Sequence, residues 1–233
     1  MSLWKHVLPA LPIVAALLTV QANAQFNYME KYAKEHGASV SVGATGNYLY
    51  SLTSNPTTQT FNTVSQGVTL TNSISNQKQE ISQSVGFLTS LQFHPVPWAG
   101  IEVNYGYQHY SEYFLYNLAS TPAQQATRVK TTAHEATAAY QFHPKHIPFQ
   151  PFLNIGGGAI DFVPTSGGQN QWRGAGLAET GFEINMPYTA RKLALRLQGR
   201  GLFYRAPNFN SALLSSRGWR VSAEPSASFV YRF

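Results

Sequence analysis

The sequence predicts an all-β protein, an antiparallel, up-and-down, eight-stranded transmembrane β-barrel. Three observations lead to this expectation. Long stretches alternate apolar and polar residues, which is the period of a strand with two different faces. Only 11% of the 233 residues are charged, against about a quarter in soluble domains. Finally, long polar connections alternate with short turns that contain proline, which is typical of barrels with long loops on one side of a membrane.

The last stretch, 219–233, shows the alternation most clearly. One face carries Trp219, Val221, Ala223, Pro225, Ala227, Phe229, Tyr231 and Phe233, and the other carries Arg220, Ser222, Glu224, Ser226, Ser228 and Arg232. A strand in a soluble protein usually has about five or six residues, whereas about 9–11 tilted residues cross a bilayer. The stretch therefore predicts a closing membrane strand, with an edge strand of a soluble sandwich as the alternative.

The amino-terminus predicts export. Lys5 and His6 precede an apolar run over 7–20, and Ala22-Asn23-Ala24 is a small-x-small cleavage site. This order is typical of a signal peptide, so 1–24 is expected to be removed and 25–37 to form a periplasmic lead-in. No apolar run of 18 residues follows residue 24, which excludes a helical membrane protein.

Composition narrows the function classes further. Cysteine is absent, so disulfides, thiol chemistry and cysteine metal sites are excluded. The formal net charge is +6, but the basic residues are scattered. A nucleic-acid partner is therefore not expected, and anionic lipid headgroups are the better candidate.

Eight strands are expected in the barrel domain, 38–233. Their ranges are 38–50, 80–93, 101–113, 128–142, 151–163, 172–186, 192–205 and 219–233. The polar connections 51–78, 114–127, 164–171 and 206–218 are interpreted as external loops. Gly156-Gly-Gly158 predicts a bulge or a close backbone approach. Pro225 lacks an amide proton within a closed sheet, which predicts a bulge there.

Aromatic residues gather at the strand ends, as expected at the two surfaces of a membrane. One rim would hold Phe93, Trp98, Tyr140, Phe142, Tyr188, Tyr231 and Phe233, and the other Tyr48, Tyr50, Tyr107, Trp172, Phe203 and Trp219. Phe229 is assigned to the same membrane-interface set.

An internal repeat accompanies this pattern: Gln92-Phe-His-Pro95 recurs as Gln141-Phe-His-Pro144. With the signal peptide, strand number, loop alternation and terminal Phe233, the chain resembles the OmpA-like family of eight-stranded outer-membrane barrels. The resemblance implies a bacterial outer-membrane location, neighbouring lipids and lipopolysaccharide, and recognition of the last strand by the barrel-assembly machinery. Members include structural anchors, adhesion factors and narrow pores. No peptidoglycan-binding domain follows the last strand, so a cell-wall tether is not expected.

Charged residues on the polar faces are expected to meet inside the barrel. An eight-stranded barrel has room only for side chains, and buried charges require partners. The set is Glu135, Glu179, Glu183, Arg196, Arg200 and Glu224. Hairpin register predicts the pairs Glu179–Arg200, Glu183–Arg196 and Arg200–Glu224. The network is interpreted as a stabilising plug, with a gate for small ions as the alternative.

Other candidate sites are weaker. His109 and Ser111 would share the outward face, which loosely resembles the His-x-Ser element of lipid A deacylases, but Glu112 replaces the expected Asn. His94, His143 and His146 lie in turns, and no three or four ligands can be assembled into a metal site. No cofactor is expected, and the chain is predicted not to be an enzyme. The expected function is a monomeric barrel with a structural or surface-interaction role through its loops. A narrow pore is the main alternative, followed by a lipid A hydrolase and a soluble lipocalin-like binder.

Overall fold

The computed structural model describes residues 37–50, 59–65, 68–118, 121–144, 149–165, 168–189, 192–209 and 218–233. The predicted signal peptide lies outside these residues, as does the lead-in before Gly37. Within the described ranges, no helix is long and apolar enough to cross a membrane.

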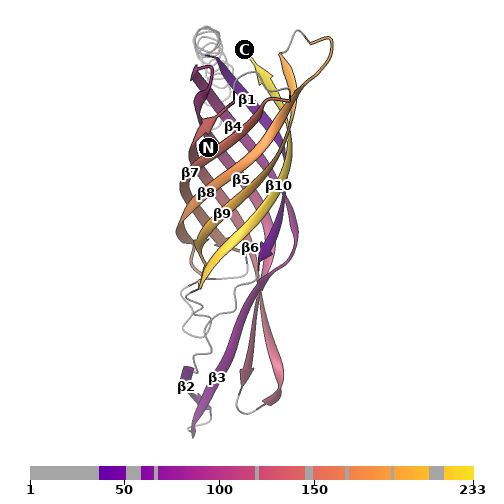
Figure 1. The fold of residues 1–233 in the computed structure, drawn as a ribbon. Coiled ribbons are helices and arrows are strands. Elements are labelled where there is room, and N and C mark those ends of the chain that lie inside the picture. Colours follow the sequence, from indigo (N-terminus) through magenta and orange to yellow (C-terminus); the bar gives the residue numbers. More distant parts are fainter. Residues whose placement is uncertain are drawn as a thin grey trace, which may run out of the picture.

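Eight antiparallel strands close into a ring (Figure 1). They are β1 (Ala38–Tyr50), β4 (Ser84–Val96), β5 (Ala99–Leu118), β6 (Thr121–Phe142), β7 (Pro151–Pro164), β8 (Gln171–Asn185), β9 (Leu193–Arg205) and β10 (Trp219–Arg232). Each pairs with the next in this order, and β10 pairs with β1. The predicted eight-stranded barrel is therefore confirmed, with most strand ends within a few residues of their expected positions.

Two further strands lie beyond the barrel. β2 (Gln59–Ser65) and β3 (Val68–Ile81) form a hairpin, and β3 also pairs with the far part of β5. This hairpin and the extended ends of β5 and β6 project from one end of the barrel (Figure 1). We call this the loop end, and the opposite end, where β10 finishes, the turn end.

The expected loop at 114–127 is wrong for most of its length. β5 and β6 continue to pair through Phe114↔Thr127 and Asn117↔Gln124. Aromatic and β-branched residues such as Phe114, Tyr116 and Thr127 favour extended backbone, so the ladder continues although the stretch is polar.

The two faces of the sheet differ as the alternation predicts. Phe229 is 60% exposed on the outer surface, whereas Arg200 and Glu224 inside the barrel are 2% and 3% exposed. Val103 and Leu193 are also exposed outside. A lipocalin-like fold would have apolar residues inside, so this facing is incompatible with the lipocalin-like alternative.

Neither predicted bulge is present. The register of β10 with β9 runs without a shift from Trp219 to Tyr231. On the other side, the pairs with β1 lapse opposite Glu224 and Pro225 and resume in the same register. Gly46 lies at this gap, where an added Cβ would be 3.6 Å from the Pro225 ring. A glycine neighbour thus accommodates the proline without an extra residue.

The glycines of β7 reflect the other predicted alternative, a close backbone approach. A Cβ on Gly156 or Gly158 would lie 2.0 Å from a carbonyl oxygen of β6, that of Ala138 or Ala136 respectively. β7 nevertheless keeps an unbroken register with β6 and β8. These positions therefore exclude larger residues for steric reasons.

Candidate functional site

The inward faces of the strands fill the barrel with charged and amide side chains. The ladder aligns Glu179 with Arg200, Glu183 with Arg196, and Arg200 with Glu224. These are the pairings that hairpin register predicts. The apolar–polar alternation of each strand determines which residues face inward, and the register between strands determines their position along the barrel axis.

Arg196 is at the centre of the first cluster, nearest the turn end. Its Nη2 donates to Glu102 Oε2 at 2.8 Å and to Glu179 Oε1 at 3.1 Å, and Nη1 lies 3.8 Å from Glu183 Oε1. The guanidinium also lies 3.9 Å from the centre of the Phe152 ring, which is a cation–π geometry. The Arg196 side chain is fully buried.

Arg200 forms the second cluster, one layer further along the barrel. Its Nη2 lies 2.5 Å from Glu135 Oε1, its Nε 3.3 Å from Glu179 Oε2, and its Nη1 3.1 Å from Glu224 Oε2. Thr137 donates to Glu135 Oε1 at 2.9 Å. Glu179 therefore bridges the two clusters, and all six predicted lumen residues belong to one connected network.

Sequence reasoning missed several members of this interior. Glu102 contacts Arg196 across the barrel. Arg220 makes a bidentate pair with Glu112 at 2.7 and 2.8 Å, and Arg232 pairs with Glu183. Glu102, Glu112 and Arg220 stand at inward positions of the alternation, which is the signal that could have found them. Their partners are on distant strands, which hairpin register cannot reveal.

Amide side chains supply the remaining donors, because carboxylates outnumber guanidinium groups in the described interior. Gln141 and Asn154 both donate to Glu102 Oε2, at 3.0 and 2.9 Å. Gln79 donates to Glu112 Oε2 at 2.8 Å. Charge-assisted hydrogen bonds of this kind help offset the cost of burying carboxylates.

An apolar cluster lies between the Arg200 cluster and the loop end, beside the Glu112–Arg220 pair. Tyr110, Ile160, Phe162, Leu202 and Tyr204 belong to one buried cluster. A cavity of about 20 Å³ lies between this cluster and the carboxylates of Glu135 and Glu224, which is room for about one water molecule. The charged clusters and the apolar cluster together fill the lumen.

Two of the three turn histidines meet at the turn end, while His146 lies outside the described residues. Nε2 of His94 and Nε2 of His143 are 3.0 Å apart. Burial, followed by the neighbouring His94, lowers the pKa of His143 to about 4. No three His, Cys, Asp or Glu side chains among the described residues form a metal-binding group.

His109 and Ser111 are engaged with different partners. His109 Nδ1 hydrogen-bonds Thr132 Oγ1 at 3.1 Å on the outer surface. Ser111 is buried, and its Oγ accepts from Arg128 Nε at 2.9 Å. Ser111 shares the outward face of β5 with His109, since Tyr110 and Glu112 on either side of it face the interior, but neighbouring side chains such as Arg128 cover it. The two residues bond to separate partners rather than to each other, unlike the base and nucleophile of an acyl-transfer site.

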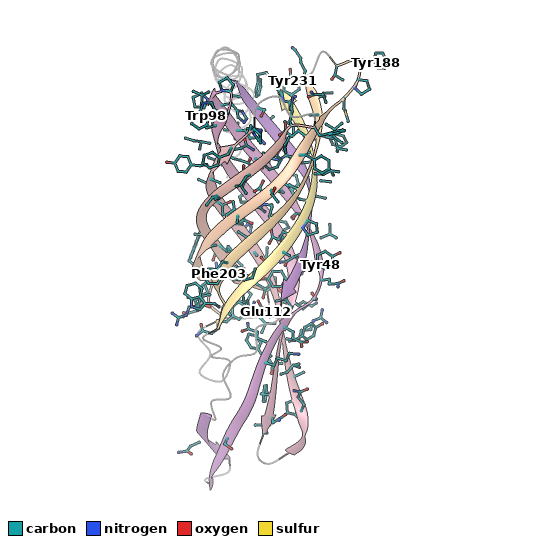
Figure 2. The ribbon with its side chains drawn as sticks, viewed as in Figure 1. Tyr48, Trp98, Glu112, Tyr188, Phe203 and Tyr231 are labelled. Carbon is teal, nitrogen blue, oxygen red and sulfur yellow. The ribbon has the colours of Figure 1, made fainter. Side chains whose placement is uncertain are left out.

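Exposed aromatic residues form two rims around the barrel. Trp98, Tyr188 and Tyr231 lie near the turn end, and Tyr48 and Phe203 near the opposite edge (Figure 2). Of the predicted interface residues, Trp98, Tyr140, Phe142, Trp172, Trp219, Phe229 and Tyr231 are exposed, and Phe233 is partly exposed. Phe203 stacks on Trp219 with ring centres 4.7 Å apart. The apolar surface between the rims is suited to acyl chains.

A closed eight-stranded sheet with apolar residues outside and paired charges inside is the fold of outer-membrane β-barrel proteins. A solved structure of such a protein has a similar fold. The outer membrane protein OprG from Pseudomonas aeruginosa aligns with a TM-score of 0.53 and 11% identity, covering 85% of this chain and 96% of that one. Neisserial surface protein A aligns with a TM-score of 0.49 and 13% identity over 84% and 97%. The sequence itself matches no protein-family model and no curated protein sequence.

Proposed function

We propose that the chain is an integral protein of a bacterial outer membrane whose sealed barrel holds the projecting hairpins at the cell surface. Its role is structural or interactional, and the hairpins provide the contact surface. The exposed apolar belt supports embedding in lipid, with acyl chains and lipopolysaccharide as its neighbours. The projecting β2–β3 and β5–β6 hairpins support a contact role, because they add paired backbone well beyond what closing the barrel needs.

The observation that carries this proposal is the burial of the charge network. Arg196, Glu102 and Gln141 are each 0% exposed, so no solvent reaches the layer that they form. An ion crossing this layer would have to displace hydrogen-bonded ion pairs, which is costly in a closed interior. We therefore favour an anchor over a pore.

Planar-bilayer recording of the purified barrel tests this choice. The sealed lumen is expected to give no channel openings, with insertion verified by heat-modifiable gel mobility. Discrete openings would instead favour the gated pore. In that case Glu179→Gln, which removes a charge shared by both arginine clusters, should alter the conductance. Fractionation into the outer membrane tests the location separately.

A further inference from the structure

The repeated Gln-Phe-His-Pro element brings two histidines together at the turn end. His94 lies near the end of β4, and His143 follows the last residue of β6. Their ring centres are 4.9 Å apart and the ring planes are inclined by 59°. The rings therefore do not stack, and their Nε2 atoms approach to 3.0 Å.

A hydrogen bond to the backbone shows which ring nitrogen of His94 carries the proton. Nδ1 lies 3.1 Å from the carbonyl oxygen of Gly37, and a carbonyl can only accept, so Nδ1 carries the proton. In the neutral ring Nε2 is then an unprotonated lone pair. A carbonyl that orients a histidine in this way is a usual neighbour of a metal-binding imidazole.

The side-chain oxygen of Gln141 also points at His94 Nε2, beside His143 Nε2. Its Nε2 donates to Glu102 at 3.0 Å, so its Oε1 faces His94 Nε2, at 2.7 Å. A proton on His143 Nε2 can satisfy the contact between the two histidines. It leaves the Gln141 oxygen against the bare nitrogen of a neutral His94 ring, which is repulsive unless a second proton or a metal ion lies between them.

We infer that His94 Nε2, His143 Nε2 and Gln141 Oε1 bind one divalent first-row transition metal ion at the turn end of the barrel. Histidine nitrogens bind Zn²⁺ at about 2.0–2.1 Å, so two ligands at adjacent positions are separated by about 2.8–3.4 Å. The His94–His143 separation of 3.0 Å lies near the short end of that range, and the His94–Gln141 separation of 2.7 Å lies just below it. Imidazole with one carbonyl oxygen is suited to copper or zinc, and Cu²⁺ is expected to bind more tightly than Zn²⁺.

The surroundings are compatible with a bound cation. His94 and His143 are partly exposed, so water can complete the coordination. The nearby carboxylate of Glu183 favours a positive charge at His143, whereas Arg196 and Arg232 oppose one. This site does not depend on the proposed surface role.

Copper binding to the untagged full barrel in detergent micelles tests the inference. Calorimetry with Cu²⁺ is expected to show one site per chain, and electron paramagnetic resonance to show two nitrogen ligands. His94→Asn and His143→Asn should each weaken binding at least tenfold. His134→Asn is the matched control, because His134 is bonded to Tyr105 on the outer face, away from the turn end.

Heat-modifiable mobility verifies that each variant is folded before its affinity is compared. Absence of stoichiometric binding by the folded wild-type barrel would overturn the metal site and leave the two histidines sharing a proton. Binding that survives both substitutions would overturn it equally, since the metal would then lie elsewhere.

Discussion

Arg196 shows how a charged side chain can be buried at the centre of a barrel. Its contacts with Glu102, Glu179 and Phe152 surround the guanidinium on several sides. A buried charge without partners costs several kcal/mol. Together these contacts offset that cost for the Arg196 guanidinium. Without Arg196, Glu102 would keep only the amide donors of Gln141 and Asn154, and Glu179 would lose one of its two arginines.

Arg196→Met is therefore expected to destabilise the barrel by about 3–5 kcal/mol, because Glu102 and Glu179 would lose their shared cation. Urea unfolding in lipid vesicles, followed by tryptophan fluorescence, measures this change. Arg205→Met is the matched control on the same strand, since Arg205 is exposed and an exposed substitution usually changes stability by less than about 0.5 kcal/mol. Equal stability of the two variants would contradict a structural role for the network.

Gly158 on β7 provides a second test, which concerns the close approach of β7 to the backbone of β6. An added Cβ would lie 2.0 Å from the Ala136 carbonyl oxygen, so Gly158→Ala must displace β6 or β7. We expect a loss of about 1–3 kcal/mol or more, seen as a lower urea midpoint. Gly174→Ala on β8 is the control, because nothing lies within 4 Å of its Cβ position. A wild-type midpoint for Gly158→Ala would mean that the strands are further apart than described.

Individual strands were largely predictable, and for a physical reason. Alternation and turn position determine a hairpin's register, which is why the pairs around Arg200 follow from the sequence. Contacts between strands that are not neighbours do not follow. Arg196 and Glu102 are 94 residues apart, and Arg220 and Glu112 are 108. Such contacts depend on the curvature and closure of the whole sheet.

The β5–β6 extension was not predicted, because its polar composition is typical of a loop. Its outer part pairs mainly with itself and with β3. Replacing 116–125 with a short turn should therefore leave the barrel folded. Heat-modifiable mobility and the urea midpoint are expected to remain close to wild type, while loss of the folded band would show that the hairpin is needed for assembly. Phe114 is kept in this variant because it packs on Phe209 with ring centres 6.4 Å apart.

The molecule as a whole reverses the arrangement of a soluble protein. The ion pairs of Arg196, Arg200 and Arg220 are enclosed, whereas many large apolar side chains are exposed. This reversal is favourable in a lipid bilayer. Acyl chains solvate the apolar outer face, and because they offer no hydrogen bonds, the polar groups must find their partners inside the barrel. A closed sheet leaves no unpaired edge, so the same closure that buries the charges also satisfies the backbone.

Lipid embedding predicts a depth-dependent response on a single strand. Leu193 and Leu197 both lie on the outer face of β9, the first at the turn end and the second near mid-strand. Leu197→Arg is expected to cost about 2–4 kcal/mol in a bilayer, and Leu193→Arg about 0–1 kcal/mol, because the penalty for a lipid-facing arginine falls toward the membrane surface. Urea titration of both variants in the same vesicles measures the difference. Similar small effects at the two positions would mean that water, rather than lipid, surrounds this face, and the membrane assignment would fail.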